Sequence, residues 1–302
     1  MRGGTMWRVA ILAACLATAS WAQEKSAEEA AKGGSLAESA RMAGEYAKLA
    51  GMQAVAVQQA EAVTVVMPQS LSKQMSAVIA SVNRYHAAAL KGTSRQGADF
   101  WGKRPVVVVF TERNQFASHV RRVEKRSFDP SERASIVVGE DQPVVGIWVE
   151  TPNTRAGVPP SVEIQVSEKV AAAVLARAAG AKNPVPDWLP EAFGRATSFQ
   201  AAGPNGRSYL AEIRRNAQLY TRSQQEPPWN AKQEGLQTQS AQAAFVYWVT
   251  YGPKAGKMAD LAKQFVPEEN QERVEFPQAL QRAQLSGDQT LGSWRDWVAI
   301  WR

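Results

Sequence analysis

The order of hydrophobic patterns along the chain is the feature that most constrains its fold. Between residues 62 and 166, short runs of β-branched residues are bounded by Pro, Gly or polar residues. The clearest run, VVVVF at 106–110, is too short for a helix. From residue 167 onward, apolar residues recur at helical spacing almost to the C-terminus. Strands first and helices afterwards are typical of an α+β fold.

These patterns predict a small N-terminal mixed β-sheet with helices, followed by a mostly helical C-terminal half. The strands are expected at 62–67, 105–110, 135–138, 144–149 and 162–166, with helices over 71–90 and 111–123 between them. The helices of the second half are expected at 168–179, 187–201, 206–222, 238–251, 254–265, 275–284 and 290–301.

The first 22 residues have the layout of a cleavable secretory signal peptide. Two arginines precede an apolar run over 9–19, and small residues at Ser20 and Ala22 stand before Gln23. We therefore expect an exported protein, periplasmic or extracellular, that begins at Gln23. The apolar run is shorter than the roughly 20 residues that a spanning helix needs, so a retained anchor is the weaker alternative and no integral span is expected after cleavage.

A second interpretation of the same segment concerns Cys15, the single cysteine of the chain. The sequence from Leu12 to Cys15 resembles a bacterial lipobox, which would make the protein a lipoprotein anchored through Cys15. Against this, the residues after Cys15 stay apolar where a lipoprotein opens into a polar tether. With cleavage after Ala22 instead, no thiol remains for chemistry.

Residues 23–61 form an Ala-rich lead-in that we expect to be helical or disordered, because helix propensity is high and apolar bulk is low. Residues 62–302 are then expected to form the main domain, strand-rich over 62–166 and helical over 167–302.

The charge pattern argues against a nucleic-acid partner. The formal net charge is +7, but acids are interspersed with the basic residues, as in RRVEKR at 121–126, and no block of five like charges occurs. We interpret these residues as a solvated surface.

Several catalytic classes lack their residues. GxSxG, P-loop and GxGxxG motifs are absent, which excludes the usual serine hydrolase, NTPase and dinucleotide-binding sites. The two histidines, His86 and His119, are 33 residues apart, and neither has a second ligand at the spacing of a metal pair. We expect both to be ordinary surface or hydrogen-bonded histidines.

Two neighbouring segments carry a resemblance to a known family. SEKVAAAVLARAAG at 167–180 is followed by VPDWLPEAFGRATSF at 185–199. This order resembles the active-site region of the peptidase MA-like (gluzincin) zinc metallopeptidases, in which an HExxH helix leads to a P-x-W-x-x-E-G-x-A helix. Trp188 and Glu191 match the second helix, and Ala192 stands where the family has Gly. The resemblance covers about 62–302 and implies a gluzincin-like fold.

The resemblance also implies that the zinc site has degenerated. In the best register, Glu168 takes the first ligand position, Lys169 the general-base position and Ala172 the second ligand position, so HExxH becomes EKVAA at 168–172. Only Glu191, the third ligand position, keeps its residue type. A methyl group cannot bind zinc and a cation cannot act as the base, so we expect no metal, no cofactor and no catalytic residue.

A carboxylate left without its metal needs another positive charge. We therefore predict an ion pair between Lys169 and Glu191, with Glu168 or Arg195 as further partners. The alternative is that all four are solvated charges on amphipathic helices. Trp188 and Arg195 are expected to line the remaining cleft, between the strand layer and these helices.

Aromatic residues near the C-terminus form a further pattern. Trp294, Trp297 and Trp301 share one face of the last predicted helix. We expect them to close the core of the helical half, the alternative being an exposed platform for sugar or peptide. Trp229, in a Pro-containing loop, is the better candidate for a surface contact.

Together, these expectations describe an exported, catalytically inactive metallopeptidase-like protein that acts as a peptide- or protein-binding or envelope-associated module. Two alternatives stay open: an active hydrolase, a peptidase that uses non-standard residues, and an envelope structural or assembly protein.

Overall fold

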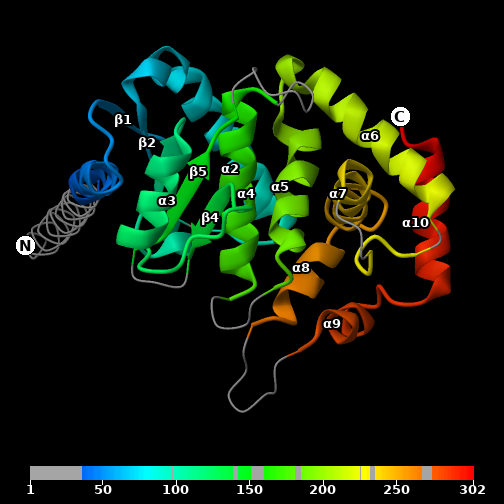
Figure 1. Cartoon of the computed structure of the whole chain (residues 1–302). Coiled ribbons are helices and arrows are strands. Elements are labelled where there is room, and N and C mark those ends of the chain that lie inside the picture. Colours follow the sequence, from blue (N-terminus) through cyan, green and yellow to red (C-terminus); the bar gives the residue numbers. More distant parts are fainter. Residues whose placement is uncertain are drawn as a thin grey trace, which may run out of the picture.

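A mixed β-sheet forms the N-terminal half of the computed structural model (Figure 1). The structure describes residues 36–96, 98–138, 142–150, 160–180, 185–224, 226–231, 235–266 and 274–302. Within these residues the strands are β1 (Val55–Gln59), β2 (Thr64–Pro68), β3 (Val106–Phe110), β4 (Ala134–Val137) and β5 (Val144–Trp148), in the spatial order β1-β2-β3-β5-β4. The three inner strands are parallel, and each edge strand is antiparallel to its neighbour.

The central strand β3 is buried on both faces, which explains its unbroken apolar run. Because successive side chains point to opposite faces, Val107 and Val109 enter one core and Val106 and Val108 the other. The first core contains α2 (Met75–Gly92) and α4 (Val162–Ala178). The second contains a helix over 36–49 and α3 (Arg113–Arg122). The sheet is therefore covered by helices on both faces.

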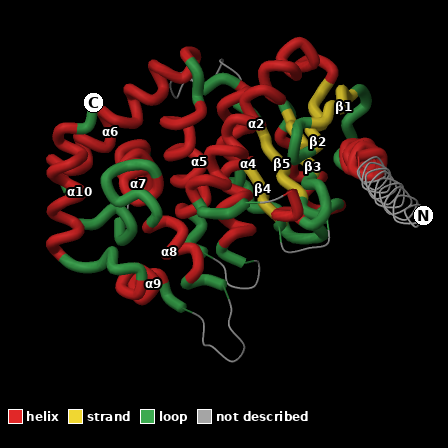
Figure 2. The backbone as a smooth tube through the Cα atoms, turned by 180° about the vertical axis from the view of Figure 1, so that it is seen from behind, coloured by secondary structure: helices red, strands yellow, loops and turns green. Residues whose placement is uncertain are grey.

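The C-terminal half is helical, as predicted. Its helices are α5 (Trp188–Ala201), α6 (Arg207–Ser223), α7 (Leu236–Thr250), α8 (Lys257–Lys263), α9 (Phe276–Arg282) and α10 (Asp288–Ile300). Short 3-10 helices lie at Gln69–Gln74, Ala98–Trp101 and Pro204–Gly206. The two opposite views in Figures 1 and 2 agree that α4 lies between the sheet and α5, and α5 packs in turn against α7. The α+β class is thus confirmed.

None of the helices in the described part of the chain has the length and hydropathy needed to cross a membrane.

The strand predicted at 162–166 is wrong: these residues form the first turn of α4. The sequence VEIQV alternates as a strand would, but Val162, Val166 and Val170 are also four residues apart and fit one helical face. A five-residue window satisfies both periods. The residues adopt a helix instead of a strand because α4 continues to Ala178 and is buried along most of its length between the sheet and α5.

The lead-in predicted over 23–61 differs from the structure at its C-terminal end. The helix over 36–49 buries Ala43 and Ala47 against the sheet, and β1 pairs with β2. The expected boundary at residue 61 therefore falls inside a β-hairpin. Strand β1 escapes prediction because it is a mostly exposed edge strand with two glutamines. The predicted signal peptide and Cys15 lie outside the described residues.

The close approach of α4 and α5 depends on a glycine. A Cβ atom at Gly194 would collide with the backbone carbonyl of Glu168, whereas one at Gly292 in α10 would meet no atom within 4 Å. We predict that Gly194→Ala lowers the free energy of unfolding by about 1–3 kcal/mol, because the two helices must separate. Gly292→Ala is the matched control and should be neutral or stabilising. Urea denaturation followed by circular dichroism measures both, and equal effects would contradict the prediction.

Candidate functional site

Helices α4 and α5 bring two oppositely charged side chains together. Lys169 Nζ donates a hydrogen bond to Glu191 Oε2 and forms an ion pair with it. The ion pair predicted from the sequence is therefore present. Its side chains are partly accessible, with 18% of Lys169 and 35% of Glu191 exposed, so the pair lies at the surface end of the contact between the helices.

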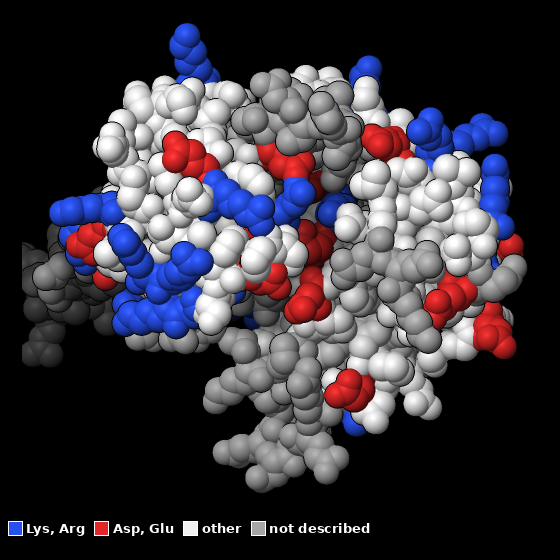
Figure 3. Space-filling model, viewed as in Figure 1, with Lys and Arg blue, Asp and Glu red and all other residues white. Residues whose placement is uncertain are grey.

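The electrostatics at Glu191 favour its ionised form. Burial alone would raise the pKa of Glu191, but the charges of Lys169 and Arg195 outweigh it, and the pKa lies below the usual 4.5. Arg195 follows Glu191 by four residues, on the same face of α5. Figure 3 shows acidic and basic side chains side by side over α4 and α5 in the middle of this face.

Glu168, by contrast, is directed into the core. Its Oε1 accepts hydrogen bonds from Ser198 Oγ at 2.5 Å and from the Tyr209 hydroxyl at 2.9 Å. The Tyr85 hydroxyl donates in turn to Ser198 Oγ at 3.0 Å. Burial raises the pKa of Glu168, opposed by the nearby charge of Arg195. Glu168 therefore belongs to a buried hydrogen-bond network joining α2, α4, α5 and α6.

The sequence did not predict that Tyr85, Ser198 and Tyr209 belong to the hydrogen-bond network of Glu168. Tyr85 and Ser198 are polar residues at buried helical positions, and Tyr209 packs beside the core. A hydroxyl in an apolar helical stripe is a usable signal, because such a group must find a partner when it is buried. It does not reveal which partner it finds.

The remaining predicted residues are not brought to a cleft. Ala172 is fully buried. The Trp188 ring packs edge-on against Phe276 of α9, with the ring centroids 5.2 Å apart. Of the two residues expected to line the cleft, only Arg195 joins the charged group.

The donor set does not fit a zinc ion. The position of the first ligand is occupied by a carboxylate engaged in the core, the second by the methyl group of Ala172, and the third by a carboxylate paired with Lys169. Among the described residues, no group of three or more His, Cys, Asp or Glu could hold a metal ion. Zinc needs at least three such donors converging on one point. The arrangement of α4 and α5 therefore provides fixed charges and hydrogen-bonding groups.

The two histidines lie elsewhere: His86 accepts a hydrogen bond, and His119 lies beside a carboxylate. Trp101 Nε1 donates to His86 Nε2 at 3.0 Å, and burial lowers the pKa of His86 to about 4. His119 Nε2 lies 3.3 Å from Glu124 Oε1, with both side chains buried. His119 also lies directly against Gly146, where a Cβ atom would come within 2.9 Å of the imidazole ring. That packing leaves no room for a ligand on this side of the ring.

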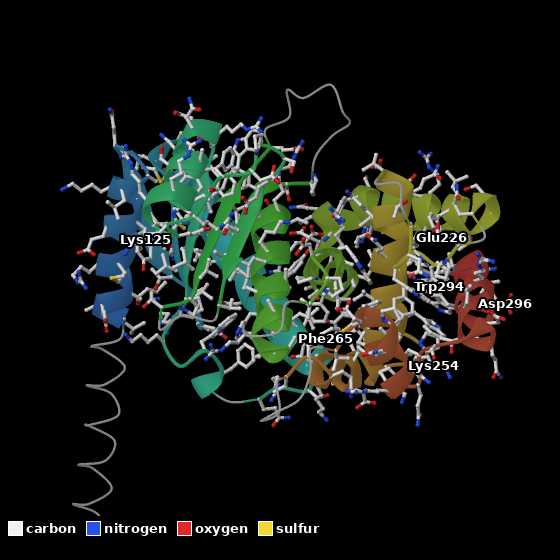
Figure 4. All side chains as sticks on the ribbon, turned by 60° about the horizontal axis from the view of Figure 1, so that its bottom comes forward. Lys125, Glu226, Lys254, Phe265, Trp294 and Asp296 are labelled. Carbon is white, nitrogen blue, oxygen red and sulfur yellow. The ribbon has the colours of Figure 1, made fainter. Side chains whose placement is uncertain are left out.

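The aromatic face of α10 divides into two parts. Trp294 is fully buried in the helical half, where Figure 4 labels it. Trp297 and Trp301 are half-buried and stack on Tyr247, with centroids 5.9 and 5.3 Å away. Trp229, the candidate for a surface contact, is half-buried, and its ring centroid lies 4.5 Å from that of Phe245. The stripe closes the helical core, and its C-terminal end stays accessible.

No protein-family model, no curated protein and no solved structure matches this chain. The likeness to peptidase MA-like proteins therefore rests on the residues of 167–199 and on the order of the elements alone.

The first prediction from this geometry concerns the Lys169–Glu191 pair. Lys169→Met should lower the free energy of unfolding by about 1–3 kcal/mol, between the values typical of exposed and of buried pairs, because Glu191 then keeps its charge with less compensation. Adding Glu191→Gln should recover part of the loss. Lys254→Met, at an exposed lysine (Figure 4), is the control. An unchanged melting temperature for Lys169→Met would show that the ion pair does not stabilise the fold.

The second prediction concerns the pH dependence caused by Glu168. Since its folded pKa lies above the unfolded value of about 4.5, the folded state holds the proton more tightly. The stability that this group contributes should fall as the pH rises through 4.5 and toward the folded pKa. Glu168→Gln removes the titration, so its stability relative to the unchanged protein should increase with pH. Denaturation between pH 4 and 8 measures this (about the range over which carboxyls of raised pKa titrate), with the exposed Glu212→Gln as control.

Proposed function

We propose that this chain is an exported, non-catalytic protein of metallopeptidase-like architecture that binds a peptide or protein segment at Lys169, Glu191 and Arg195. The observation that carries the proposal is the partly exposed ion pair of Lys169 and Glu191, which stands at the positions that the resemblance assigns to the general base and a zinc ligand. A fixed charged group that replaces reactive residues suits recognition better than bond cleavage.

The chemistry of the charged group supports a peptide as the ligand. Lys169 and Arg195 supply ammonium and guanidinium donors, which complement a carboxylate such as a peptide C-terminus or an acidic side chain. Glu191 supplies an acceptor for backbone N–H groups. A polypeptide segment offers both kinds of partner at once.

Cleavage finds no support in the same residues. A hydrolytic site needs a nucleophile or activated water beside a general base. At the general-base position, Lys169 is a cation paired with Glu191. The hydroxyl group of the neighbouring Ser198 donates a hydrogen bond to Glu168 in the core. The alternative of an active peptidase therefore requires residues outside this group.

One observation favours the second candidate, an envelope structural or assembly role. Leu49, at the end of the N-terminal helix, and Val57, on the edge strand β1, are 44% and 39% exposed. Exposed apolar side chains beside an unpaired strand edge are suited to contact with another protein. Such a role would use the sheet half and leave Lys169 and Glu191 uninvolved.

Metal content and peptide binding together test the proposal. We expect the purified protein to contain no stoichiometric zinc by elemental mass spectrometry and to leave a peptide library uncleaved. On a peptide array it should retain a defined subset of sequences. Lys169→Met should weaken that binding by about tenfold or more, corresponding to the loss of one charged contact, whereas Lys254→Met should not.

Zinc that chelation removes together with cleavage activity would contradict the proposal and favour the peptidase. Peptide binding that is equal in both variants would place the ligand elsewhere on the molecule. If no peptide binds while the protein assembles into a defined oligomer, the structural role is the better account.

A further inference from the structure

A basic hollow lies at the C-terminal end of α3, in the half that holds the sheet. The cavity has a volume of about 680 Å³ and is lined by Arg121, Lys125, Arg126, Ser127 and Phe128. Figure 3 shows Lys and Arg side chains gathered over α3 and the loop beside it, and Figure 4 labels Lys125 in this half. The interspersed charges of 121–126 predict a solvated surface. The sequence pattern does not show that the loop after α3 forms a hollow.

One wall of the hollow is a fixed arginine. Arg126 Nε lies 2.8 Å from Glu124 Oε2, Arg126 also pairs with Glu132, and its Nη2 donates to Ser135 Oγ at 2.9 Å. Glu124 is buried, and its pKa is lowered because the neighbouring His119, Ser135 and Arg126 outweigh the effect of burial. Glu124 and Glu132 are thus engaged by Arg126.

Two further cations keep their charge uncompensated. Neither Arg121 nor Lys125 has a carboxylate within ion-pair distance among the described residues. The Arg121 guanidinium lies 5.7 Å from the centroid of the Phe128 ring. Stacking on an aromatic face holds the planar guanidinium while its N–H edge stays free to donate.

The backbone at Lys125 forms the turn that ends α3. Lys125 has φ of 56°, in the left-handed region where a side chain is unfavourable and glycine is preferred. The turn is held by a hydrogen bond from the Arg126 N–H to the Val120 carbonyl at 3.3 Å. A lysine therefore occupies a position at which glycine would be more stable, and its side chain lines the hollow.

We propose that this hollow binds the phosphate group of a phosphorylated ligand. The polar side chains that line it, two guanidinium groups, an ammonium and a hydroxyl, can all donate hydrogen bonds, and no carboxylate is among them. A phosphate offers several acceptor oxygens and close to two negative charges, which suits this donor set better than a single carboxylate does.

Titration calorimetry with inorganic tripolyphosphate on the full chain tests the proposal. Lys125→Gly is the decisive variant, because glycine adopts the left-handed backbone without strain and its melting temperature should equal or exceed that of the unchanged protein. Its affinity for tripolyphosphate should nevertheless fall about tenfold. Arg121→Gln should cause a similar loss. Lys254→Gln removes an exposed charge elsewhere and should change neither quantity.

Two sources of phosphate are distinguished by a second arm. Phosphatidylcholine vesicles with and without phosphatidic acid are sedimented with the same variants. Tripolyphosphate binding alone indicates a soluble ligand, and binding only to vesicles that contain phosphatidic acid indicates a lipid headgroup. Either result supports the site if Lys125→Gly weakens the binding and Lys254→Gln does not.

The proposal is overturned if neither probe binds, or if the Lys125 and Lys254 variants lose affinity equally. Binding of a single-stranded oligonucleotide without binding of either probe would also overturn it. The peptide site on α4 and α5 involves none of these residues, so the two proposals fail independently.

Discussion

The contact between α4 and α5 is the constraint on which the rest of the molecule depends. One side of helix α4 packs on the sheet and the other on α5. Helix α5 packs in turn against α7, which contacts α6, α8 and α10. The two axes approach closely because Gly194 has no side chain where the backbone of Glu168 passes. The alanines at 171–173 are buried along the same helix. Small residues at this seam thus determine how the helical half is placed on the sheet.

The same seam explains why charges can persist between the helices. The side chain of Glu168 points into the core, where it accepts hydrogen bonds from the hydroxyl groups of Ser198 and Tyr209. The side chain of Glu191 lies near the surface, where it pairs with Lys169. A buried carboxylate is costly unless it is hydrogen-bonded or paired. Hydrogen bonds and nearby charge reduce this cost for both carboxylates, but the pKa of Glu168 stays raised by burial, whereas that of Glu191 is lowered by Lys169 and Arg195.

The two proposed binding regions differ in how their charges are used. At Lys169 and Glu191, opposite charges neutralise each other and present both donors and acceptors to the surface. At the end of α3, the carboxylates of Glu124 and Glu132 hold Arg126, while Arg121 and Lys125 remain uncompensated. The first arrangement suits a ligand of mixed polarity, and the second suits an anion.

The sequence by itself determined the α+β class, the order of strands and helices and most element positions, because hydrophobic periodicity directly reflects which face of an element is buried. It also predicted the pairing of Lys169 with Glu191, because the family resemblance implies that Glu191 is a carboxylate left without its metal and in need of a positive charge. It failed at 162–166, where a short window fits two periods, and at β1, an exposed edge strand. Only the tertiary structure decided that Glu168 turns to Ser198 and Tyr209, that Trp188 packs on Phe276, and that Arg121 and residues 125–128 line an open hollow. Those contacts join residues far apart in the chain or depend on loop geometry, and no local pattern specifies them.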